Sequence, residues 1–165
     1  MQSLKAAGPG PSDLVRSDEP VIPRLVRGRT AQLTRALRDE VEQLEGLRAV
    51  LARQRRGVAA NDPEILDASV RELGRALLTL DEARRGRQAL VSLLRGEDGG
   101  SLSDLESWFP GRVPQELIAA RDAIFVAAAS AESDLALNQD VLDGALQAGD
   151  AFLQCLFSGH VPGAR

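Results

Sequence analysis

Apolar residues recur at alternating steps of three and four along three long segments, and this spacing restricts the fold more than any other feature of the chain. On an α-helix such a spacing places the apolar side chains on one face, whereas a strand alternates at every second residue. Between Thr30 and about residue 60 the stripe contains Leu37, Val41, Leu44, Leu51 and Val58. Between residues 63 and 95 it contains Leu66, Val70, Leu73, Leu77 and Leu80. We therefore predict an all-α, coiled-coil-like bundle.

The break between these two segments has the chemistry of a tight turn. Asn61 suits the C-terminal cap of the first helix, Asp62 the N-terminal cap of the second, and Pro63 its first position. Because short connections join antiparallel neighbours, the sequence predicts a long antiparallel hairpin. After it comes "SLSDLESWF", where Ser101 and Asp104 have the spacing of a capping box. We predict a short helix there, attached to the bundle by Trp108.

The third long segment runs from about Pro114 to Phe157 and is too long for the hairpin to cover. At 1.5 Å per residue the first two helices span roughly 45 Å each and the third about 64 Å. Its C-terminal part should therefore project about 20 Å past the turn at residues 61–63. This projecting part includes Leu146, Phe152, Leu153, Leu156 and Phe157. The alternative is that the helix breaks at Gly144 or Gly149 and folds back.

The ends of the chain lack the helical pattern. Prolines and glycines are frequent in residues 1–29, so we expect a disordered N-terminal arm. The helical domain is then expected at 30–157, followed by a flexible tail at 158–165. Aromatic residues make up only 3% of the chain, which argues against a sheet protein.

Charge and cysteine content exclude several functional classes. Lys and Arg total 20 against 24 Asp and Glu, a net charge of −4, so we expect neither nucleic-acid nor membrane-surface binding. No apolar run reaches the roughly 20 residues that a membrane span needs. A single cysteine, Cys155, suits a reducing cytosol, and we interpret it as a small apolar core residue. These features predict a cytoplasmic protein.

Residues for catalysis or metal binding are scarce. One histidine, His160, and one cysteine do not make a zinc site, and the chain has no glycine-rich phosphate loop. We therefore expect no enzyme activity, no metal and no cofactor. The arginine clusters "RQRR" (53–56) and "ARRGR" (83–87) are interpreted as solvated helix faces, paired with acids four residues away. An anion-binding or acidic-partner site is the alternative for these clusters.

The layout resembles the FlgN-like flagellar export chaperones over about residues 31–157. The resemblance is carried by "ARQRRGVAANDPEIL", "LTLDEARRGRQALVSLL", the connector "SLSDLESWF" and a long last helix containing "LNQDVLDGAL". It implies a chaperone that binds the C-terminal helical segments of flagellar hook-associated proteins, prevents their premature assembly and delivers them to the type III export apparatus. It also implies that clients bind the C-terminal part of the chaperone.

The resemblance and the length of the third helix indicate the same surface. We predict that the client-binding residues lie on its stripe: Leu135, Asn138, Leu142, Leu146, Phe152 and Leu156. Asn138 is expected to fix the register of a helix pair, as buried amides do in coiled coils. The competing interpretation is a structural or adaptor protein that self-associates through this helix and has no export client.

Overall fold

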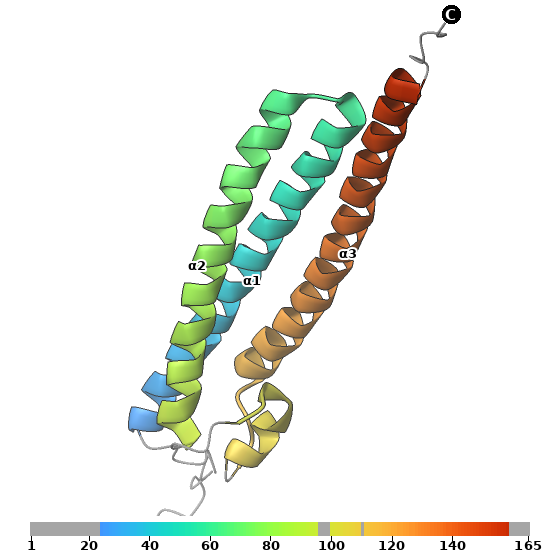
Figure 1. Cartoon of the computed structure of the whole chain (residues 1–165). Helices are drawn as coiled ribbons and strands as arrows, with labels where there is room; N and C mark the ends of the chain where they lie inside the picture. Colours follow the sequence, from blue (N-terminus) through green and yellow to red (C-terminus); the bar gives the residue numbers. More distant parts are fainter. Residues whose placement is uncertain (1–23, 96–99, 110, 159–165) are drawn as a thin grey trace, which may run out of the picture.

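The computed structural model describes residues 24–95, 100–109 and 111–158. It contains three long helices, α1 (Arg24–Ala60), α2 (Pro63–Arg95) and α3 (Gln115–Ser158), and a short 3₁₀ helix, η1 (Leu102–Trp108) (Figure 1). No strand occurs among the described residues. The predicted all-α class, with a long hairpin and a longer third helix, is therefore confirmed.

Helix α1 is the central element of the fold. It packs against both α2 and α3, whereas α2 and α3 share at most a marginal contact. Arg29 near the start of α1 donates to Leu93 near the end of α2, and Arg53 near the end of α1 pairs with Glu72 in the first part of α2, so these two helices are antiparallel. Arg38 in the first half of α1 pairs with Glu116 at the start of α3, and Gln54 farther along α1 bonds Asn138 farther along α3, so α1 and α3 run parallel. The three helices form an open layer with α1 in the middle (Figure 1).

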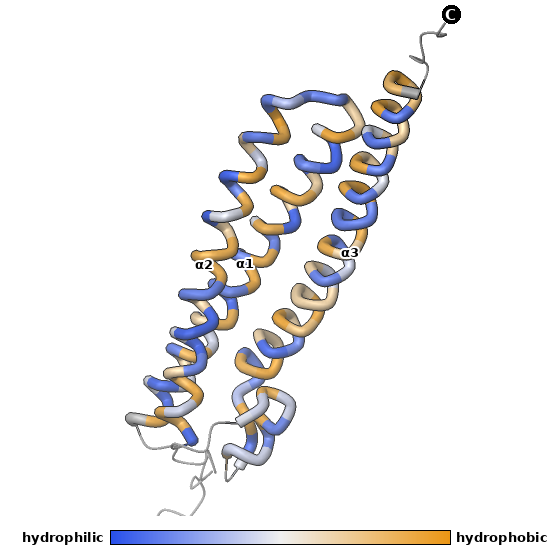
Figure 2. Tube along the Cα trace, viewed as in Figure 1, coloured by the Kyte–Doolittle hydropathy of each residue, from blue (hydrophilic) through white to orange (hydrophobic). Residues whose placement is uncertain are grey.

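The core of α1 contains part of the predicted stripe together with leucines beside it. Leu33, Leu37, Leu47 and Leu51 are almost completely buried, because neighbours cover this helix from two directions. On α3 the buried face contains alanines, among them Ala120, Ala127 and Ala131. Figure 2 shows apolar and polar residues alternating along each helix, as amphipathic helices require.

The predicted turn between α1 and α2 is confirmed in detail. Asn61 has φ 50° and takes the left-handed conformation of a helix C-terminal cap. The amide of Asp62 donates to the carbonyl of Gly57 at 2.9 Å, and that of Asn61 donates to Val58 at 3.0 Å. At the start of α2, the amides of residues 64 and 65 donate to Oδ1 of Asp62 at 3.0 and 3.1 Å. Both helix ends are thus satisfied within a few residues.

Gly57 allows α1 and α2 to approach closely beside this turn. A Cβ atom at this position would lie 2.9 Å from Cγ2 of Ile65 and 3.2 Å from Cδ2 of Leu66, whereas one at Gly46 would meet nothing within 4 Å. We expect Gly46→Ala to raise the free energy of unfolding by about 0.5–1 kcal/mol through helix propensity. Gly57→Ala should lose this gain to the steric conflict. Urea unfolding of both variants checks the prediction, which is contradicted if they are equally stabilised.

Helix α1 begins at Arg24, earlier than the sequence pattern predicted. The expected arm therefore ends before residue 29, because the last of its prolines, Pro23, is followed by a stretch without proline. Val26 packs against the core, and the guanidinium of Arg29 donates to the carbonyl of Leu93 at 2.8 Å. The rest of the expected arm, residues 1–23, and the tail after Ser158 lie outside the described residues.

Helix η1 joins the end of α2 to the start of α3. Ser101 caps it by accepting a hydrogen bond from the amide of Ser103 at 3.2 Å, and Leu102 and Leu105 are buried. Trp108 packs against the core, and the guanidinium carbon of Arg95 lies 5.6 Å from the centre of its ring. The predicted role of Trp108 in attaching the connector is therefore confirmed.

Candidate docking surface on α3

Helix α3 continues without a break from Gln115 to Ser158. The helix passes through Gly144 and Gly149, neither of which has another group within 4 Å of its Cβ position. The alternative in which the helix breaks at one of these glycines and folds back is therefore wrong. The last part of α3 instead extends past the turn between α1 and α2 (Figure 1).

The length of the projection follows from the contact between Gln54 and Asn138. About 20 residues of α3, or about 30 Å, follow Asn138, whereas about six residues of α1, or about 9 Å, follow Gln54. The projection is thus about 20 Å, as the length of the sequence pattern predicted. We call residues 143–157 the free end of α3, and all of them are exposed.

The free end carries a dense set of large apolar side chains. Their exposed fractions range from 50% for Leu153 to 77% for Phe157. The set consists of Leu146, Phe152, Leu153, Leu156 and Phe157. A concentration of this kind is typical of an interaction surface rather than of a solvated helix.

The structure separates the predicted client-binding residues into two groups. Leu146, Phe152 and Leu156 are exposed on the free end, Leu135 is 41% exposed, and Leu142 is partly buried. Leu153 and Phe157 belong to the same surface, although they lie beside the predicted stripe rather than on it. The exposure of the projecting segment, rather than the stripe alone, is the signal that identifies them.

Asn138 belongs to the interior instead. It is 5% exposed, and its Nδ2 donates to Oε1 of Gln54 at 2.8 Å. Its Oδ1 is buried without a hydrogen-bond partner. The expected cross-helix amide contact is confirmed, but the contact lies between α1 and α3 of one chain. A client cannot reach Asn138 in this arrangement, so we remove it from the docking surface.

Cys155 is exposed rather than part of the core. It lies on the free end, where no other helix of the described residues covers α3. The interpretation of Cys155 as a small core residue is therefore wrong.

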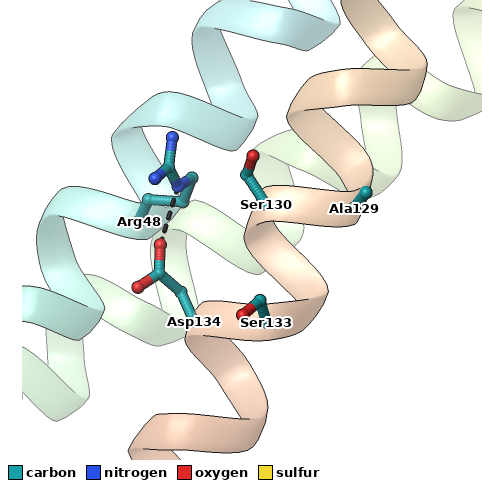
Figure 3. A pocket seen from close by; sticks show the side chains of 5 residues that line it. All are labelled: Arg48, Ala129, Ser130, Ser133 and Asp134. Atoms are coloured by element: carbon teal, nitrogen blue, oxygen red, sulfur yellow. Dashed lines mark hydrogen bonds and ion pairs between the residues drawn. The ribbon is translucent and has the colours of Figure 1, made fainter.

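Three arginines of α1 form ion pairs with the neighbouring helices. Nε of Arg48 and Nη2 of Arg55 lie 2.7 and 2.9 Å from the carboxylate of Asp134, and Nη1 of Arg53 lies 2.5 Å from that of Glu72. Figure 3 shows Arg48 reaching Asp134 from the neighbouring helix, at a shallow pocket lined also by small residues of α3.

Most residues of the two arginine clusters therefore act differently from the expected pattern. Glu40 of α1 is bound by both Arg84 and Arg87, so these arginines also join two helices. Only Arg85 follows the expected pairing within a helix, with Asp81. The sequence pattern did not indicate the cross-helix pairs, because these depend on which faces meet.

Arg48 and Arg55 hold the pKa of Asp134 below its ordinary value, chiefly through the hydrogen bond from Arg48. The unfolded chain then binds a proton at higher pH than the folded chain. The contribution of Asp134 to stability is complete above its unfolded pKa, near 3.8, and is lost as pH falls through the lower folded value.

We expect Asp134→Asn to be destabilised at neutral pH, by about 1–3 kcal/mol, since charged hydrogen bonds are lost. The difference from the original chain should shrink as pH falls below about 4. Urea unfolding of both proteins between pH 3 and 7 provides the measurement. A difference that stays constant over this range would contradict the assignment.

Comparisons with protein-family models, curated proteins and solved structures gave no match. Among the helices described here, none combines the length and the apolar character needed to cross a membrane. Within residues 24–95, 100–109 and 111–158, no group of three or more His, Cys, Asp or Glu side chains is arranged to hold a metal ion.

Proposed function

We propose that this chain is an export chaperone that binds the C-terminal helical segments of flagellar hook-associated proteins. In this role it acts in the cytoplasm, prevents premature assembly of its clients and presents them to the export apparatus. One observation carries the proposal: no other described helix lies against the free end of α3, which exposes Leu146, Phe152, Leu153, Leu156 and Phe157. The resemblance of the sequence to FlgN-like chaperones supports the choice of client.

The free end is suited to receive an amphipathic helix. Two helices pack through apolar side chains spaced three and four residues apart, and Phe152 and Leu156 have this spacing. Gly144 and Gly149 lower the helix propensity of the same segment, so its backbone can adjust to a client. Burial of the exposed leucines and phenylalanines supplies the driving force, at roughly 1.5–3 kcal/mol for each fully buried side chain.

Calorimetric titration of the full chain with C-terminal segments of hook-associated proteins from the same genome tests the proposal. We expect saturable binding with a negative heat-capacity change, because apolar surface is buried. Absence of binding to every such segment would contradict it.

Sedimentation of the free chain over a wide range of concentration distinguishes an export chaperone from the self-associating alternative. A constitutive dimer whose mass and stability do not respond to any client segment would favour a structural or adaptor protein. A monomer, or a weak dimer that dissociates when a client binds, is the result expected for a chaperone.

A further inference from the structure

The ion pairs of α1 define which edges of α2 and α3 face each other. Arg53 binds Glu72 of α2 and Arg55 binds Asp134 of α3, so these pairs mark one edge of each helix. Arg53 and Arg55 are two residues apart, which places them about 200° apart around α1. The buried face of α1, with Leu47 and Leu51, lies between them. The opposite edges of α2 and α3 therefore face each other across this buried face, and we call them the inner edges.

Both inner edges are apolar and incompletely covered. On α2, Val70 and Leu77 are 57% and 46% exposed, and they lie seven residues apart on one line. On α3, the equivalent line starts at Leu135, which is 41% exposed, and continues along the free end. The line on α3 consists of Leu135, Leu142, Leu146 and Leu153. Because Glu72 and Asp134 bind neighbouring residues of α1, these parts of α2 and α3 are at the same level.

The chain itself bridges α2 and α3 at the other end of the layer. There η1 contacts both helices: Glu106 pairs with Arg121 of α3 at 2.5 Å, and Trp108 stacks on Arg95 of α2. Its Leu105 is completely buried. A helical segment thus joins the two helices at one end and leaves the inner edges open beside residues 70–77 and 135–153.

Charge along α3 indicates which helix fits the open part. From Asp122 to Ser158 the sequence contains six acids and no Lys or Arg. Glu132, Asp143 and Asp150 are exposed and form no ion pair within the described part of the chain. Each lies three residues before a leucine of the inner edge, namely Leu135, Leu146 and Leu153, and is its neighbour on the helix surface.

The C-terminal end of α3 adds to this negative potential. Its last turn has no basic side chain, so no side chain within that turn offsets the partial negative charge of the helix dipole. Two copies of the chain that met through these edges would bring like charges together. A helix with Lys or Arg along its polar margin would instead meet opposite charges.

We propose that the inner edges of α2 and α3, together with the free end, seat one amphipathic helix of another protein whose margin is basic. The seated helix completes a four-helix arrangement over α1, contacts Val70 and Leu77 on one side, and faces Glu132, Asp143 and Asp150 on the other. The identification of this partner as an export client rests on the proposed function. The basic margin of the partner helix and its contact with α2 go beyond the proposed function.

We call the inner edges of α2 and α3, together with the free end, the seat. Two sets of peptides test the seat and the identity of the client independently. The first is the set of hook-associated C-terminal segments, and the second is a pair of designed amphipathic peptides with the same leucine spacing and either Lys or Glu margins. We expect the Lys peptide to bind the full chain at least about 10-fold more tightly than the Glu peptide at low salt, with a difference that shrinks as salt rises. Equal binding of the two peptides would overturn the proposed charge selection.

Three variants of the full chain test the individual contacts, each checked by a thermal melt. Val70→Ser with Leu77→Ser removes the edge on α2, and Glu132→Gln with Asp143→Asn and Asp150→Asn removes the charges. Leu78→Ser with Val126→Ser is the control, because these side chains are 69% and 68% exposed and lie outside the proposed edges. We expect the first two variants to weaken binding of the Lys peptide about 10-fold and the control to leave it unchanged.

The outcomes distinguish this inference from the proposed function. If only changes on the free end weaken binding of the client segments, the seat between α2 and α3 is wrong and the chaperone function stands. If the Lys peptide binds as expected but no client segment does, the seat stands and the proposed function is wrong.

Binding that tightens more than about 10-fold when residues 1–23 are deleted would assign the seat to that segment of the chain and overturn the inference. A stable dimer of the chain that buries the free end around Cys155 would also overturn the inference.

Discussion

Replacing Leu146 and Phe152 together by Ser is expected to weaken binding of the client segment by about 2–4 kcal/mol, or about 30- to 1,000-fold. These side chains are 69% and 64% exposed in the free chain, so a client helix has most of their surface left to bury. For the same reason the substitutions should change the melting temperature of the free chain very little. Calorimetric titration of the folded variant, beside thermal melts, measures both quantities.

Leu78→Ser with Val126→Ser is the matched control for this variant. Leu78 and Val126 are as exposed as Leu146 and Phe152, but they lie away from the free end of α3. Equal losses of affinity in the two double variants would indicate a non-specific effect of removing apolar surface. A Leu146/Phe152 variant that unfolds much more easily, yet binds normally while folded, would show that these residues belong to a core.

The helices and the turn could be predicted from the sequence because their signals are local. The spacing of Leu37, Leu44 and Leu51 determines which face of α1 is buried, whatever the neighbouring helix is. Asn61 and Asp62 satisfy backbone groups within a few residues of themselves, so the turn needs no tertiary information. The projection of α3 was predictable as well, since the rise per residue of an α-helix is fixed.

Features that depend on tertiary neighbours could not be predicted in the same way. Arg55 and Arg87 look like solvated residues in the sequence, but each is largely buried against an acid of another helix. Asn138 is on the predicted stripe, yet its partner is Gln54, and no local pattern connects the two. Cys155 is of a residue type common in cores but is exposed, because none of the other described helices reaches the free end. The structure thus exposes the projecting part of the predicted surface and removes one predicted member, Asn138, from it.

Glu40 is the residue whose replacement should cost the most stability among the polar residues of α1. Its side chain is 4% exposed, Nε of Arg87 lies 2.6 Å from its Oε2, and Nε of Arg84 lies 3.6 Å from its Oε1. The side chain of Arg87 is itself only 18% exposed. We expect Glu40→Leu to lower the free energy of unfolding by about 3–5 kcal/mol, because it leaves the Arg87 charge partly desolvated and without its partner.

The double variant Glu40→Leu with Arg87→Leu should recover most of this loss. When both charges are replaced by apolar side chains, no unpaired charge remains in the α1–α2 interface, and such replacements are often neutral or stabilising. Asp81→Ala serves as the control, because Asp81 and Arg85 form an exposed pair on α2 and its loss should cost less than about 1 kcal/mol. Urea unfolding of all the variants, combined in a double-mutant cycle, measures the coupling. A double variant as unstable as Glu40→Leu alone would mean that the loss of stability comes from packing rather than from the unpaired arginine. The alignment of α1 and α2 would then not depend on this ion pair.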